Sequence, residues 1–151
     1  MQSVRVFSCY KRLEVQKPVF WYYAIMSRTQ FEIYVEEGIA ALPEWVRKEL
    51  NNIAFLLSDA PTRAQREENN LSENDILFGL YEGVPLSERG NAEVSMPDRI
   101  TIFMESIREV YKKEDDIREC VKNTIWHEVA HHFGHDEKWV KREEKKRGLI
   151  L

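Results

Sequence analysis

Hydrophobic positions between residues 27 and 50 recur at the spacing of an α-helix. Ser27, with Gln30 three residues later, has the pattern of a capping box that begins a helix. Pro43 is placed to open a second, short helix, because proline is favoured in the first helical turn. The apolar positions of the first helix would form one buried face, made of Phe31, Tyr34, Val35, Ile39 and Leu42.

Three short apolar runs in the middle of the chain predict strands. Ile53–Leu57 and Ile76–Tyr81 are compact apolar runs, and Arg99–Met104 alternates between polar and apolar residues. Residues 62–75 are charged and rich in asparagine, and they show no periodicity. We therefore expect a small sheet, with a loop or a frayed helix between its first two strands.

The C-terminal third predicts one long helix and one shorter helix. The long helix begins near Asp116, which is followed by Glu119, and Gly134 is placed to end it in a left-handed conformation. The shorter helix begins near Asp136. The apolar rows of the long helix lead directly to Glu128 and His131. Burying charged groups is energetically costly, so their presence on so apolar a segment indicates a functional role. The flanking apolar side chains are those of Trp126, Val129, Ala130 and Phe133.

Composition narrows the class of protein. The chain has 151 residues, of which 43% are hydrophobic, as in a single globular domain. A net charge of −4 argues against a nucleic-acid partner. No apolar run approaches the length of a membrane span. Cys9 and Cys120, far apart in the sequence, fit a reducing cytoplasm better than a disulfide scaffold.

The first 25 residues differ from the rest of the chain. A basic stretch precedes the apolar run from Val19 to Met26, which loosely resembles a signal peptide, but no A-x-A cleavage site follows. We expect residues 1–25 to be an extension, with Met26 as the natural or ancestral start and residues 26–151 as the domain. A further reading makes Pro18–Ile25 an edge strand.

The segment His127-Glu128-Val129-Ala130-His131 carries the clearest chemistry. Histidines four residues apart lie one helical turn apart, so their rings can share one Zn²⁺. Glu128 projects beside the metal, where it can take a proton from a zinc-bound water. The alternative is a solvated helix face without a metal. The apolar neighbours argue against this alternative, because they would bury the charged side chains without a metal ion to compensate for the lost hydration.

A catalytic zinc site needs a third protein ligand and an open fourth position. Glu137, three residues after Gly134, is the preferred third ligand. Asp136 is the rival, although it also resembles the N-cap of the last helix, and His135 is a weaker choice. Glu143 and Glu144 are nearer to the histidines than a ligand from a downstream helix would normally be, and they stay open as alternatives.

Three segments together resemble a known family, the minimal zincins, which are small bacterial proteins described as zinc metallopeptidases. The segments are residues 127–134 (HEVAHHFG) with Asp136 and Glu137, residues 79–90 (GLYEGVPLSERG), and Pro97–Ile100. The resemblance covers about residues 26–147. It implies an α+β zincin-like core, with a short sheet packed on the active-site helix. Members often carry aspartate where this chain has Glu137.

The resemblance and the motif together predict a zinc-dependent metallopeptidase. Zinc-bound water, activated by Glu128, would attack a peptide amide. Tyr81, Arg89 and His132 are candidates to stabilise the transition state or to hydrogen-bond the ligands. A peptide or protein substrate would pair with the edge of 76–81 or 99–104. In so small a frame, a protein partner is a candidate to complete the cleft.

Two other functions compete with this hypothesis. In the first, zinc only stabilises a non-catalytic interaction module, and such a structural site would be closed by four protein ligands. The second is a zinc-dependent ribonuclease of the rRNA-maturation type. Glu128, which suits water activation on an amide, and the negative net charge both argue against the ribonuclease.

Overall fold

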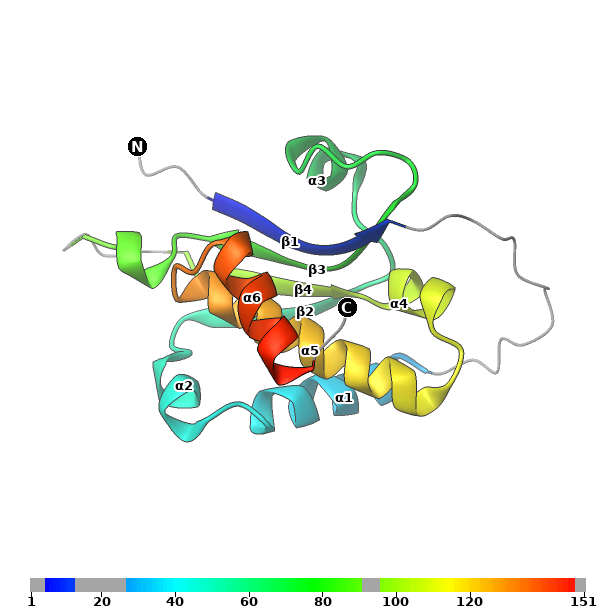
Figure 1. Cartoon of the computed structure of the whole chain (residues 1–151), viewed down its shortest axis with the longest axis horizontal. Helices are drawn as coiled ribbons and strands as arrows, with labels where there is room; N and C mark the ends of the chain where they lie inside the picture. The colour runs from blue at the N-terminus through cyan, green and yellow to red at the C-terminus, as the bar shows by residue number, and fades with distance from the viewer. Residues whose placement is uncertain (1–4, 13–26, 91–95, 149–151) are drawn as a thin grey trace.

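The computed structural model describes residues 5–12, 27–90 and 96–148, with the side chains of the last two ranges (Figure 1). The chain contains six α-helices and four strands among the described residues, and the strands form one small sheet, which confirms the predicted α+β class. The expected strand at Pro18–Ile25 and the expected start at Met26 lie outside the described residues. The elements are β1 (Arg5–Arg12), α1 (Arg28–Ala40), α2 (Glu44–Glu49), β2 (Ile53–Ser58), α3 (Arg63–Glu68), β3 (Asp75–Gly83), the 3₁₀ turn η1 (Leu86–Glu88), β4 (Asp98–Phe103), α4 (Met104–Val110), α5 (Glu114–His132) and α6 (Glu137–Arg147).

The sheet has four strands among the described residues, in the order β1-β3-β4-β2. β3 is antiparallel to both β1 and β4, whereas β2 runs parallel to β4. β1 belongs to the segment that we expected to be an extension. The expectation that β3 or β4 offers a free edge for a peptide is wrong, because each of them is paired on both sides.

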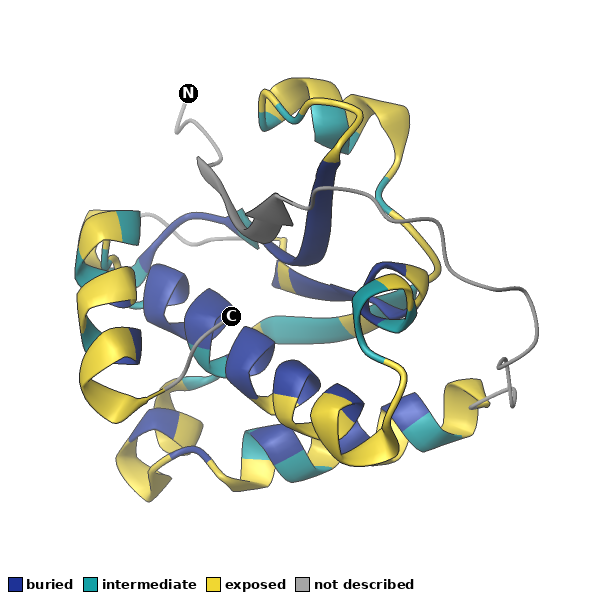
Figure 2. Ribbon diagram, turned by 45° about the vertical axis from the view of Figure 1, so that its right-hand side comes forward, coloured by how far each residue is buried: buried dark blue, intermediate teal, exposed yellow. Residues whose placement is uncertain are grey.

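Helix α5 is the central support of the fold. It crosses one face of the sheet, contacts β1, β3 and β4, and is packed in turn by α1 and α6. Its inward surface is buried along most of its length (Figure 2). The helix begins at Glu114, two residues before the expected start, since three acidic residues in its first turn favour the positive end of the helix dipole. Its main core contacts come from Ile117, Val121, Ile125 and Val129.

Two glycines let neighbouring segments approach α5 closely. A side chain at Gly79 in β3 would collide with the Cγ2 methyl of Thr124 and would lie 3.3 Å from Cγ of Glu128. The missing side chain therefore lets α5 lie directly on the strand. Gly134 ends the helical segment with φ of 93°, as expected from the sequence. A Cβ at Gly134 would also collide with Ser87, so both its conformation and its surroundings require glycine.

Two short helices add to the expected pattern: the first realises an alternative that the sequence left open, and the second departs from the prediction. Residues 63–68 form α3, which is held by a reciprocal capping box between Thr62 and Gln65. It lacks periodicity because none of its residues is buried. Met104 was expected to end a strand but begins α4, because β4 stops at Phe103. Neither difference affects the position of the C-terminal half of α5.

Candidate metal centre

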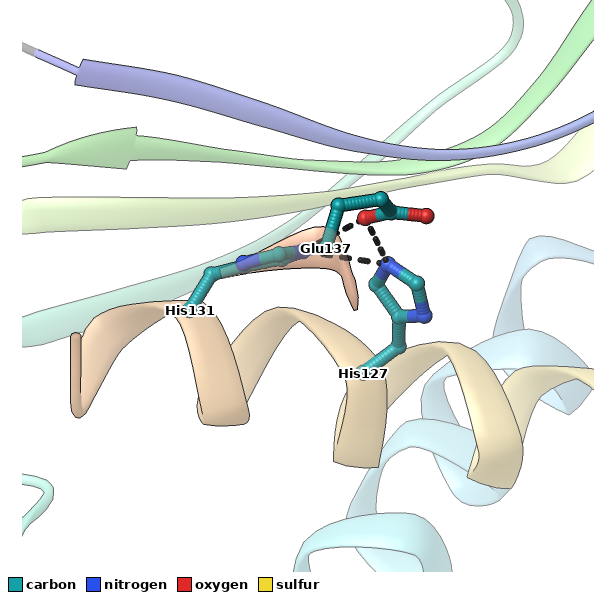
Figure 3. Close-up of side chains that lie close together, drawn as sticks. All are labelled: His127, His131 and Glu137. Atoms are coloured by element: carbon teal, nitrogen blue, oxygen red, sulfur yellow. Dashed lines mark hydrogen bonds and ion pairs between the residues drawn. The ribbon is translucent and has the colours of Figure 1, made fainter. Parts of the chain in front are cut away.

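His127 and His131 project from the last turns of α5 toward the same point (Figure 3). Their Nε2 atoms lie 3.1 Å apart, and their ring centroids are separated by 4.9 Å. The exposed fractions of the two residues are 2% and 0%. Helical spacing thus places two buried nitrogen donors side by side.

Glu137 reaches these histidines from the first turn of α6. The chain reverses at Gly134, whose N–H donates to the His131 carbonyl at 2.9 Å. Glu137 Oε2 then lies 3.2 Å from His127 Nε2 and 3.1 Å from His131 Nε2. Among the described residues, these three offer ligand atoms that all lie within 4.8 Å of one another, close enough to hold a metal ion.

Electrostatics within this cluster favour an ion pair when no metal is bound. Burial alone would lower the pKa of His127, but hydrogen bonds to Glu137 and Glu144 and the nearby charge of Glu128 raise it to about 10. The pKa of Glu137 is lowered in spite of its burial, because both histidines hydrogen-bond its carboxylate. A metal ion would replace the proton held between these groups, since an imidazole must be neutral to coordinate.

The outer ring nitrogens of both histidines also have partners. His127 Nδ1 lies 2.6 Å from Glu144 Oε1. His131 Nδ1 lies 2.8 Å from the carbonyl oxygen of His135. A carbonyl oxygen only accepts hydrogen bonds, so this contact places a proton on Nδ1, and in the neutral ring the Nε2 lone pair of His131 is then available to a metal.

The rival third ligands lie in other surroundings. Asp136 is the N-cap of α6, and its Oδ1 accepts a hydrogen bond from the Trp139 N–H at 2.8 Å. The ring of His135 stacks on that of Trp139, with centroids 3.6 Å apart. Of the candidates weighed from the sequence, Glu137 is therefore the one that the turn brings to the two histidines.

Glu128 lies one residue beyond His127 and points to the sheet. It is fully buried, and its Oε2 accepts a hydrogen bond from the backbone N–H of Tyr81 at 3.0 Å. A Cβ on Gly79 would come within 3.4 Å of Oε1, which shows how closely the carboxylate approaches β3. The carboxylate is thus held between α5 and the strand, beside the cluster of His127, His131 and Glu137.

Comparison with known families agrees with this arrangement. A family model described as zincin-like metallopeptidase matches residues 50–147. The chain belongs to the zincin-like metallopeptidase family. The matched range is shorter than the resemblance seen in the sequence, because it begins after α1 and α2. It includes all three residues of the candidate cluster. No curated protein matches the chain.

In this zincin-like chain, Tyr81, Arg89 and His132 gather around Asp98 at the start of β4. The Tyr81 hydroxyl donates to Asp98 Oδ2 at 2.7 Å, and His132 Nδ1 lies 2.9 Å from the same oxygen. Arg89 forms an ion pair with this carboxylate, which is only 2% exposed. The three candidates thus share a partner that sequence reasoning missed.

This Asp98 network ties the loop after β3 to α5. Burial, and then the hydrogen bond to Asp98, raise the pKa of Tyr81, whereas burial lowers the pKa of His132 against the opposing effect of Asp98. Each of these side chains directs one polar atom at Asp98, while Arg89 Nε donates to the carbonyl of Val84 at 2.8 Å. The only sequence signal was Pro97-Asp98 within the family resemblance, and it gave no partner.

Within residues 27–90 and 96–148 of this zincin-like protein, no helix is both long and apolar enough to cross a bilayer.

Proposed function

We propose that this protein is a zinc-dependent metallopeptidase in which His127, His131 and Glu137 hold the metal and Glu128 is the general base. One observation carries the proposal: the ligand atoms of the three residues converge within 4.8 Å, and two of these residues lie on the same end of α5 as the buried Glu128. Membership of the zincin-like metallopeptidase family supports the same assignment.

The donor set fits zinc. Two imidazole nitrogens and one carboxylate oxygen are ligands that zinc accepts, and three protein ligands leave the fourth position open for catalysis. A purely structural site would be closed by four protein ligands, and the cluster found among the described residues has three members. Bound zinc would supply Lewis acidity, lowering the pKa of a water molecule toward neutrality and polarising the substrate carbonyl.

Glu128 is placed to move the proton in this reaction. The hydrogen bond from the Tyr81 N–H fixes Oε2 against β3. As the general base, the Glu128 carboxylate would accept the proton of the attacking water and then deliver it to the leaving amine. The proposed substrate is a peptide amide. Because the domain is small, a protein partner is proposed to complete the binding cleft. The buried thiol of Cys120 fits a cytoplasmic location.

The decisive experiment compares zinc content and peptide hydrolysis in three proteins. The wild-type chain is expected to bind one zinc and to cleave members of a broad peptide library. Glu128→Gln keeps an acceptor for the Tyr81 N–H, so it should retain zinc while hydrolysis falls by roughly 10²–10⁴-fold. His131→Ala should lose zinc and activity together.

Two outcomes would contradict the proposal. Release of zinc from Glu128→Gln would show that Glu128 is a ligand rather than the base. A zinc-loaded wild-type protein that cleaves no peptide in the library would favour the non-catalytic interaction module instead.

A further inference from the structure

Glu144 is a buried acid on a helix whose other charged residues are mostly exposed. It is 7% exposed and lies two turns after Glu137 on α6, so both carboxylates face α5. Val140 lies between them on the same face and is fully buried. The last helix therefore presents two acids and one apolar contact to the helix that carries His127.

The carboxylate of Glu144 meets the outer nitrogen of His127. Its Oε1 lies 2.6 Å from Nδ1, whereas Glu137 approaches Nε2 on the other side of the ring. We propose that Glu144 is a positioning residue for the metal centre: it accepts the Nδ1–H of His127, fixes the ring, and leaves the Nε2 lone pair for the metal. This inference rests on the proposed zinc site.

The two histidines differ in how they are held. His131 donates its Nδ1–H to a backbone carbonyl, that of His135, which no side-chain substitution removes. His127 depends on a side chain from another helix. A carboxylate on the outer nitrogen also makes the imidazole a stronger donor to a metal, which a neutral carbonyl does less well. Among the described residues, Glu144 is the side chain that contacts the outer nitrogen of His127, so its substitution is expected to change the zinc affinity of that histidine.

The neighbouring Glu143 provides a matched control. It has the same chemistry and lies next to Glu144, but its Oε1 accepts from Lys146 Nζ at 2.6 Å instead of contacting His127. Substitution of Glu143 changes the charge of the helix equally and leaves the contact between Glu144 and His127 in place.

The experiment measures zinc affinity by competition with a chromophoric chelator for the full chain and for Glu144→Gln, Glu144→Leu and Glu143→Gln. Loss of such an outer partner typically weakens metal binding by roughly 10–100-fold. We expect a loss of this size for Glu144→Leu, a smaller loss for Glu144→Gln, whose amide oxygen can still accept the Nδ1–H, and none for Glu143→Gln. In the zinc-loaded wild-type protein, ¹⁵N spectra of the histidine rings should show His127 protonated at Nδ1 and bound through Nε2.

Three results would overturn the inference. The first is wild-type zinc affinity in folded Glu144→Gln, and the second is coordination of His127 through Nδ1. The third is a lower melting temperature of metal-free Glu144→Leu with unchanged zinc affinity, which would show a structural pair alone. A wild-type chain that binds no zinc would overturn the proposed function itself, before any Glu144 variant is compared.

Discussion

Asp136 and Glu137 are adjacent acids, but the first turn of α6 gives them different environments. Asp136 caps the helix, whereas Glu137 contacts both histidines. Glu137→Gln is therefore expected to weaken zinc binding by at least about 100-fold, more than loss of an outer partner. Asp136→Asn should keep zinc, since asparagine is an equally good N-cap. Chelator competition measures both, and the reverse order of the two variants would make Asp136 the ligand.

The pair of His127 and Glu137 predicts the pH dependence of the metal-free protein. The pKa of His127 is raised to about 10, so its stabilising contribution is complete below about pH 6.5 and is lost as the pH rises toward 10. The pKa of Glu137 is lowered, so its contribution is complete above about pH 4.5 and is lost in stronger acid. The melting temperature with a chelator present should therefore fall between pH 6.5 and 10.

Zinc should reverse this trend, because coordination requires neutral imidazole and is favoured by rising pH. The difference in melting temperature between zinc-loaded and metal-free protein should thus grow over the same range. Glu137→Gln serves as the control and should flatten the metal-free profile. A metal-free melting temperature that is constant from pH 6.5 to 10 would contradict the assigned ion pair.

How much of the site the sequence could predict depended on the separation of the residues. His127, Glu128 and His131 share one helix, so periodicity alone relates them. Partners of the histidines on this helix come from other elements: Glu144 is 17 residues from His127, and Asp98 is 34 residues from His132. Nothing in the local pattern specifies such contacts, because they depend on how α6 and β4 pack.

At the level of elements, the contact between α5 and β3 decides where Glu128, the proposed general base, lies. Gly79→Ala would drive a methyl group into Thr124 and against Glu128. We expect it to destabilise the fold by roughly 1–3 kcal/mol, as overpacking does. Displacement of Glu128 should also lower hydrolysis. Denaturant unfolding and peptide cleavage measure the two effects.

The same contact offers its own controls. Thr124→Ser removes the Cγ2 methyl and keeps the hydroxyl that donates to the Cys120 carbonyl at 2.8 Å. Combined with Gly79→Ala, it should restore most of the lost stability. Gly90→Ala meets nothing within 4 Å and should change little. A double variant no more stable than Gly79→Ala would show that the clash with Thr124 is not the cause.

The helices and strands that could be predicted from the sequence are those with a buried face. The apolar rows of α5 and the short runs of β2 and β3 were readable because one or both faces of each are covered. The short helix α3 has no buried residue, so hydrophobicity gave no period to recognise. α4 was missed because apolar residues continue from β4 into its first turn, and alternation alone does not show where a strand ends.

For the whole molecule, zinc binding should stabilise the docking of α6. The helix carries the proposed ligand Glu137 at its start and packs on α5 through Val140 and Glu144. Zinc at 100 times its Kd should add about 2.7 kcal/mol to the free energy of unfolding. Hydrogen exchange should slow in α6 on zinc addition. His131→Ala should show neither change, and unaltered exchange in zinc-loaded α6 would contradict the coupling.

β1 has a consequence for any substrate that binds as an extended strand. It pairs with β3 so that Phe7 and Cys9 lie opposite Tyr81 and Gly79, where Glu128 contacts the strand. A peptide aligned there competes with a tethered segment of the same chain. Its apparent dissociation constant then equals the intrinsic value divided by the fraction of molecules in which β1 is detached. Phe7→Pro combined with Ser8→Pro removes adjacent backbone donors from β1, so KM should fall while kcat stays constant. An unchanged KM would mean that peptides approach the zinc without using this edge.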